Sequence, residues 1–116
     1  MNPAYLVGLG GALGAMARYL VAGRVPEGRL PYGTLTVNVV GSFVLGTLTF
    51  VGVGDDVMLL VGTGACGAFT TFSSFSVETS LLWERGEHGL AALNAAGNLA
   101  ACLLAVGTGW LVAALL

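Results

Sequence analysis

Four long apolar stretches, separated by short polar turns, make up almost the whole chain. A helix needs about 20 mostly apolar residues to cross the hydrocarbon core of a bilayer. Charged and turn-forming residues delimit the expected spans, which cover residues 4–23, 31–53, 57–83 and 89–116. Because the connections are short, neighbouring helices are expected to run antiparallel, with both ends of the chain on one side. The pattern predicts an all-α integral membrane protein with four transmembrane helices in one domain, residues 1–116.

The composition agrees with an integral membrane protein. Of the 116 residues, 56% are hydrophobic and only 9% are charged, and the mean hydropathy is +0.89. A soluble domain carries about 25% charged residues, so an ordinary cytosolic enzyme and a disordered chain are excluded. The four arginines are scattered and lysine is absent, so no basic patch exists and no nucleic-acid partner is expected.

The sequence lacks the residue patterns of enzymes and of transition-metal sites. Cys66 and Cys102 form no CxxC pair and lie far in sequence from His88, the single histidine. No phosphate-binding loop, nucleophile triad or metal-ligand cluster is present, and Glu78 and His88 are expected near the membrane interfaces. The chain is therefore not expected to be an enzyme. No basic segment precedes the first apolar stretch, which is expected to remain as a helix rather than a cleaved signal peptide.

The arginines give a modest orientation signal. Arg24, Arg29 and Arg85 belong to the first and third connections, whereas the Asp55-Asp56 turn and both ends carry no Lys or Arg. The positive-inside rule places the arginine-bearing connections in the cytoplasm. The protein is expected in the cell membrane (the plasma or inner membrane), with several spans.

The first span combines several small residues with one charged residue, Arg18. Glycine accounts for 19 of 116 residues, about 16%, which is roughly twice ordinary usage. Gly10 and Gly14 form a GxxxG spacing that suits either close packing within the chain or an oligomer interface. Arg18 lies about one turn from the end of this span, so its side chain either extends to the interface or serves as a vestibule charge that attracts anions.

Polar side chains within the second and fourth spans are candidates for function, because polar groups are costly in hydrocarbon. Asn38 shares a helix face with Thr34 but not with Thr36. Its amide suits either an interhelical hydrogen bond or an N–H donor that faces a water-filled path for an anion. In the fourth span, polar side chains recur every four residues and favour a path lining. These residues are Asn94, Asn98 and Cys102.

The third span contains poor material for an unbroken helix. Glycines at 62, 64 and 67 precede a run of hydroxyl residues from Thr70 to Ser76. A break here is expected to free carbonyls around Gly64 to Gly67 and to leave N–H groups that Thr70 or Thr71 could cap. Such backbone is tolerated at membrane depth only when protein buries it or when it lines a cavity. Freed carbonyls attract a cation, and the start of the second half-helix favours an anion.

Two phenylalanines follow the expected break. Phe72 and Phe75 are three residues apart and share a helix face. Aromatic rings have positive edges, so two edges turned into a narrow path could solvate a small anion. Phenylalanines at this spacing commonly only pack, but Ser73, Ser74 and Ser76 beside them favour a polar lining.

Three segments carry a resemblance to a known family. They are Gly10-Gly11-x-x-Gly14-x-x-x-Arg18-Tyr19, Gly33-Thr34-Leu35-x-x-Asn38-x-x-Gly41-Ser42-Phe43 and Gly67-x-x-Thr70-Thr71-Phe72-Ser73-Ser74-Phe75-Ser76-x-Glu78. In this order and spacing they resemble the Fluc/CrcB fluoride channels. The resemblance is close over the first three spans and loose over the fourth, and the run in the third span is its most specific part.

The resemblance implies an antiparallel, dual-topology dimer with two fluoride pores and a structural sodium ion at the dimer centre. It implies that the backbone carbonyls of Gly67 and Thr70 bind the sodium ion. The implied fluoride pore residues are Phe72, Phe75, Asn38, Ser73, Ser74 and Thr36, and Asn94, Asn98 and Cys102 correspond to a polar track on the fourth helix. Three arginines on one side allow either a homodimer or a fixed orientation with a paired, homologous subunit; we favour the homodimer.

The sequence thus leads to the hypothesis of a passive, fluoride-selective channel that exports cytoplasmic fluoride. One alternative is a small multidrug-resistance exporter, which needs a carboxylate in the first span, where this chain has only Arg18. Another alternative is a non-conducting scaffold subunit, which would explain the glycines but not the polar residues within the membrane.

Overall fold

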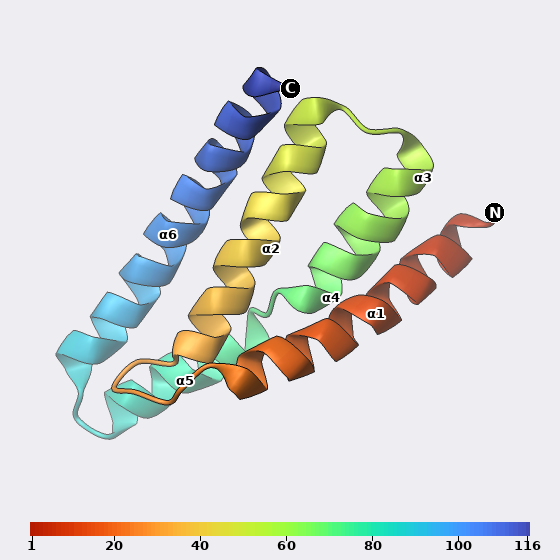
Figure 1. The fold of residues 1–116 in the computed structure, drawn as a ribbon. Helices are drawn as coiled ribbons and strands as arrows, with labels where there is room; N and C mark the ends of the chain where they lie inside the picture. Colours follow the sequence, from red (N-terminus) through yellow and green to blue (C-terminus); the bar gives the residue numbers. More distant parts are fainter.

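The computed structural model describes residues 1–116 and contains four helical spans long and apolar enough to cross a membrane (Figure 1). Three are single helices: α1 (Pro3–Arg24), α2 (Tyr32–Val51) and α6 (His88–Leu115). The third span consists of α3 (Asp55–Val57), the π-helix η1 (Met58–Cys66), α4 (Gly67–Phe69) and α5 (Ser73–Glu84). The prediction of an all-helical membrane protein with four spans is confirmed, and the helix ends lie within a few residues of the expected bounds.

Local signals in the sequence explain where the helices begin and end. The Asn2 side chain accepts a hydrogen bond of 2.9 Å from the Ala4 N–H, and Pro3 occupies the first position of α1, where its missing N–H does no harm. Gly52 after α2 and Gly86 after α5 adopt left-handed backbone angles, with φ of 77° and 80°. Glycine adopts this conformation without a steric penalty, so both helices can end in tight turns.

The spans form two pairs joined through the interrupted third span. α6 packs along α2, α1 packs along η1 and α4, and α5 contacts α6 (Figure 1). Both ends of the chain lie at the same end of the bundle as the α2–α3 connection, as the short turns predicted. The arginine-bearing connections, α1–α2 and α5–α6, lie together at the opposite end.

The glycines of α1 allow its backbone to touch η1. A Cβ atom at Gly10 would overlap the Leu60 carbonyl, and one at Gly14 would overlap the Ala65 carbonyl. Gly64 faces α1 in return, because a Cβ atom there would lie 2.8 Å from the Val7 carbonyl oxygen. The GxxxG spacing therefore serves packing within the chain, which decides between the two uses that the sequence left open.

The interruption of the third span lies near its middle and directly after the glycine run, as predicted. The chain remains helical through Gly62, Gly64 and Gly67 and leaves the helix only at residues 70–72. Carbonyls around Gly64 are therefore not freed, since Gly64 still accepts a hydrogen bond from the Gly67 N–H. Gly62 and Gly64 instead make close contacts, and the helix is broken at the Thr-Thr-Phe segment, where the sequence analysis expected the capping threonines.

The protomer has almost no interior of its own. Only 18 of 116 residues are buried, and the molecule measures 49 × 30 × 20 Å, so it is a thin slab. Large apolar side chains are exposed on every span, from Leu13 on α1 to Leu104 on α6. Such a surface requires lipid or a second subunit around it.

Candidate functional site

The interruption between α4 and α5 is organised by two threonines. Thr70 adopts an extended conformation (φ −81°, ψ 160°), and its N–H and hydroxyl both donate to the Cys66 carbonyl, at 3.0 Å and 2.9 Å. The Thr71 hydroxyl oxygen accepts a hydrogen bond of 3.1 Å from the Ser74 N–H at the start of α5. Of the two threonines expected as caps, Thr71 is the one that caps the second half-helix.

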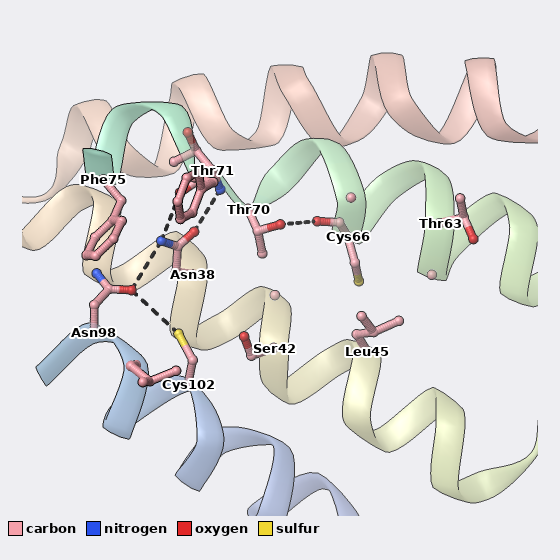
Figure 2. A pocket seen from close by; sticks show the side chains of 15 residues that line it. Asn38, Ser42, Leu45, Thr63, Cys66, Thr70, Thr71, Phe75, Asn98 and Cys102 are labelled. Atoms are coloured by element: carbon pink, nitrogen blue, oxygen red, sulfur yellow. Dashed lines mark hydrogen bonds between the residues drawn. The ribbon is translucent and has the colours of Figure 1, made fainter. Parts of the chain in front are cut away.

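Asn38 on α2 binds the interrupted segment through its side-chain amide. The Thr71 N–H donates to Asn38 Oδ1 at 2.7 Å, and Asn38 Nδ2 donates to the Thr71 carbonyl at 3.1 Å. Asn38 Nδ2 also donates to Asn98 Oδ1 on α6, at 3.3 Å (Figure 2). Asn38 thus joins the second span, the break and the fourth span.

Asn98 offers a hydrogen-bond donor that the protein does not use. Its Oδ1 accepts from Asn38 Nδ2 and, at 3.7 Å, from Cys102 Sγ, which fixes the orientation of the amide. Its Nδ2 has no hydrogen-bond partner although Asn98 is only 6% exposed. In Figure 2 this nitrogen is turned away from Cys102 and toward the side where Phe75 lies. A buried, unpaired N–H₂ group is costly unless a ligand or water occupies the space before it.

A groove with a volume of about 620 Å³ runs beside this network and contains the interrupted segment (Figure 2). Its walls come from α2, η1, the break, α5 and α6, and no charged side chain lines it. The lining residues are Asn38, Gly41, Ser42, Leu45, Gly62, Thr63, Cys66, Gly67, Thr70, Thr71, Phe72, Phe75, Asn98, Leu99 and Cys102.

The two phenylalanines, Phe72 and Phe75, both line the groove. Their ring centroids are 5.8 Å apart and their planes are tilted by 46°, an arrangement that aromatic pairs prefer over face-to-face stacking. Phe72 is 79% exposed on the protomer. A side chain this large and apolar requires cover from lipid or from a second subunit.

Arg18 reaches inward rather than toward the membrane interface. Its guanidinium donates to the Thr70 carbonyl at 3.4 Å, so the Arg18 side chain extends from α1 to the break. The interpretation that Arg18 extends to the interface is therefore wrong, because the free carbonyl at Thr70 offers its guanidinium an acceptor. Arg18 does not line the groove itself.

Comparisons with known proteins agree with this architecture. The family described as CrcB-like protein, Camphor Resistance (CrcB), matches residues 5–110. A Haloarcula marismortui protein named fluoride-specific ion channel FluC 2 is 61% identical over 110 residues, which cover 95% of this chain and 92% of the relative. The chain belongs to the CrcB family. A relative from Methanocaldococcus jannaschii, named fluoride-specific ion channel FluC, is 46% identical over 113 residues. The aligned region covers 93% of this chain and 91% of the relative.

Membership in the CrcB family decides between the classes that the sequence left open. The family consists of ion channels, so the chain is a multi-pass membrane protein of a channel family and not an enzyme or a drug exporter.

Seven of the residues expected at the fluoride pore, the sodium site or the polar track line the groove in the structure of this CrcB protein. They are Asn38, Gly67, Thr70, Phe72, Phe75, Asn98 and Cys102. Arg18 reaches the break through the Thr70 carbonyl.

Four other residues singled out in the CrcB sequence do not line the groove. The Thr36 hydroxyl donates to the Tyr32 carbonyl of its own helix. Ser73 and Ser74 belong to the cap of α5. Asn94 Nδ2 donates to Thr79 Oγ1 at 2.8 Å, so Asn94 ties α6 to α5 instead of continuing the lining.

Glu78, which the sequence analysis placed near a membrane interface, is half-buried and paired with Thr34. Thr34 Oγ1 donates to Glu78 Oε1 at 2.8 Å, and Glu78 Oε2 is buried without a partner. Both residues line a second cavity of about 430 Å³ beside the α1–α2 connection, which also includes Arg29 and Arg85. One feature of the sequence could have indicated this contact. Thr34 shares a face of α2 with Asn38, so both side chains point toward the third span.

Proposed function

We propose that this protein is a passive, fluoride-selective channel that lets cytoplasmic fluoride leave the cell. The observation that carries the proposal is the buried Asn98 Nδ2 group, which has no partner in the protein and belongs to a residue that lines the groove beside the break. An N–H donor without an acceptor is suited to a small anion. Relatives named fluoride-specific ion channels, at identities of 42–61%, support fluoride as that anion.

The chemistry of the groove fits an anion that must bind and leave. N–H groups, hydroxyls and aromatic edges offer partial positive charge to an anion. The first turn of α5 contributes its helix dipole from the same place. Because no charged side chain lines the groove, these dipoles would hold an anion without a fixed opposite charge. Conduction requires this balance, since an ion bound too tightly would block the path.

A second subunit, inserted upside down, is proposed to close the groove. The slab is only 20 Å thick and leaves Phe72 79% exposed beside the groove, so one protomer cannot enclose a path. A copy in the opposite orientation would cover that face and provide a second, equivalent path. The favoured assembly is the homodimer, and the alternative is a paired homologous subunit, since the connections that carry the arginines lie at one end of the bundle.

A structural sodium ion is proposed between the two copies. No backbone N–H outside the helical ladders donates to the carbonyls of Gly67 or Thr70. No atom lies within 4 Å of the position a Gly67 side chain would occupy, so a second backbone can approach there. Free carbonyl oxygens at an unwound helix suit sodium. When bound, the ion would offset the carbonyl dipoles at the break and join the subunits; the Arg18 guanidinium also donates to the Thr70 carbonyl.

Export needs no energy source in this proposal. Fluoride crosses membranes as its neutral acid and ionises in the more alkaline cytoplasm, so the anion accumulates inside. The membrane potential, negative inside, then drives the anion outward through a selective path. The chain contains no nucleotide-binding motif that would couple transport to hydrolysis.

The test is fluoride efflux from liposomes that contain the purified protein alone. We expect fluoride to leave when the electrical balance is maintained by a potassium ionophore, and chloride to stay. Equal leakage of both anions, or of neither, would contradict the proposal. Preparing the same vesicles with N-methylglucamine in place of sodium tests the cation separately, with reduced flux and a weaker dimer as the expected result.

A further inference from the structure

Thr71 lacks every backbone hydrogen bond that a helix would provide. No backbone group donates to its carbonyl and none accepts from its N–H. At membrane depth such groups must find partners in the protein, because lipid offers none. The Asn38 amide satisfies both groups, with the bonds of 2.7 Å and 3.1 Å described above. One side chain thus replaces both hydrogen bonds that the interruption removes.

Asn38 has no donor left for an ion once these bonds are made. A carboxamide carries two N–H donors. One donates to the Thr71 carbonyl and the other to Asn98 Oδ1. The Asn98 amide differs, because its oxygen accepts two hydrogen bonds and its nitrogen makes none. The network therefore leaves the N–H₂ of Asn98, a residue that lines the groove, without a partner in the protein.

A second contact from the next turn of α2 supports the same role. Gly41 lies against the Thr70 side chain, and a Cβ atom at Gly41 would overlap Thr70 Cγ2. Asn38 and Gly41 are three residues apart on one face of α2. Together they hold two consecutive residues of the break, Thr71 by hydrogen bonds and Thr70 by close packing.

We infer that Asn38 is a positioning residue rather than an ion ligand: it holds the interrupted backbone at Thr71 and orients the Asn98 amide, whose Nδ2 group meets the anion. This inference rests on the proposed function, because it assigns the roles of two residues within the same path. It replaces the expectation that Asn38 itself donates to fluoride.

The first experiment locates fluoride in the unmodified protein. Solid-state NMR on ¹⁵N-labelled protein in lipid bilayers, with fluoride present, can detect dipolar contacts between ¹⁹F and side-chain amide protons. We expect a contact with the Asn98 Nδ2 protons and none with those of Asn38. A contact with Asn38 Nδ2 would overturn the inference, even if vesicle efflux supports the channel. Absence of fluoride efflux would instead refute the proposed function.

The second experiment measures hydrogen exchange at the Thr71 amide in lipid nanodiscs. We expect Asn38→Ala to accelerate this exchange at least about tenfold, since its only acceptor is lost. Asn98→Ala and the control Asn94→Ala should leave it slow. Slow exchange in Asn38→Ala, or equal acceleration in all three variants, contradicts the inference. If Asn38→Ala does not fold, Asn38→Asp is used, which retains the acceptor oxygen and should keep the Thr71 amide slow.

A double-mutant cycle on fluoride flux separates positioning from direct binding. We expect Asn98→Ala to reduce flux about tenfold, as loss of a hydrogen bond to a charged partner does. If Asn38 acts through Asn98, adding Asn38→Ala, or Asn38→Asp where the alanine variant does not fold, reduces flux by less than it does in the wild-type background. If the two reductions multiply, the residues act independently and the inference fails.

Discussion

The two halves of the third span are held by different forces. The first half, from α3 to α4, is apolar and packs against α1 through backbone contacts at Gly10, Gly14 and Gly64. The second half, α5, is joined to its neighbours by hydrogen bonds, from Thr34 to Glu78 and from Asn94 to Thr79. Close packing holds the first half against α1, and directional polar bonds hold the second half. The interruption at Thr70–Phe72 is where one kind of stabilisation gives way to the other.

The largest effect is expected from filling the glycine contact of the first half. Gly10→Ala places a Cβ atom against the Leu60 carbonyl, and neither backbone can move away without separating α1 from η1. We expect a loss of about 3 kcal/mol or more, the upper range for overpacking, and little monodisperse protein after size-exclusion chromatography in detergent. Gly8→Ala is the matched control, because nothing lies within 4 Å of its Cβ position. Equal yields from the two variants would contradict the packing described.

A smaller, purely functional effect is expected at the start of the second half. Phe75→Ile and Phe72→Ile keep an apolar side chain but remove the aromatic edge. We expect each to reduce fluoride flux about tenfold, equivalent to about 1.4 kcal/mol, with little change in thermal stability. Phe50→Ile, on an exposed part of α2, serves as control and should conduct normally. Undiminished flux in both groove variants would remove the aromatic edges from the mechanism.

The smallest effect is expected at a single polar contact of the second half. Thr34→Val deletes the only hydrogen bond to the Glu78 carboxyl group. An unsatisfied buried acceptor costs about 1–3 kcal/mol, although polar contacts in membranes average only about 0.6 kcal/mol. We therefore expect a loss of about 1 kcal/mol by thermal unfolding, and recovery in Thr34→Ser, which keeps the hydroxyl. A valine variant as stable as the serine variant would show that this bond does not hold α5.

The fold could be predicted from sequence because the membrane imposes simple rules. Charges and turns divided the chain into spans of the correct length, and short connections fixed their alternation. The run of glycines and hydroxyls also indicated an interrupted third span. The sequence did not show that Gly64 stays within the helix, because a glycine that breaks a helix and one that admits a neighbour look the same in sequence. Only the backbone contacts of Gly10 with Leu60 distinguish the two uses.

The site was only partly predictable. Sequence spacing shows which residues share a face of a helix, but it does not show which other helix that face contacts. Asn94, Asn98 and Cys102 do share a face of α6, but Asn94 meets Thr79 while Asn98 reaches the groove. Thr36 appeared beside Asn38 in sequence, yet its hydroxyl binds its own helix. Arg18 donates to the Thr70 carbonyl, which is available as an acceptor only because the helix is interrupted there. Partners of this kind depend on three-dimensional packing.

The π-helical geometry of η1, residues 58–66, gives this stretch an unusual tolerance to changes in chain length. A π-helix accommodates more residues per turn than an α-helix, because its hydrogen bonds join residues five apart. Deleting one residue here could be absorbed by tightening into an ordinary helix, so that Thr70 and Phe75 would keep their directions. The same deletion in α6 would rotate every following side chain by about 100°.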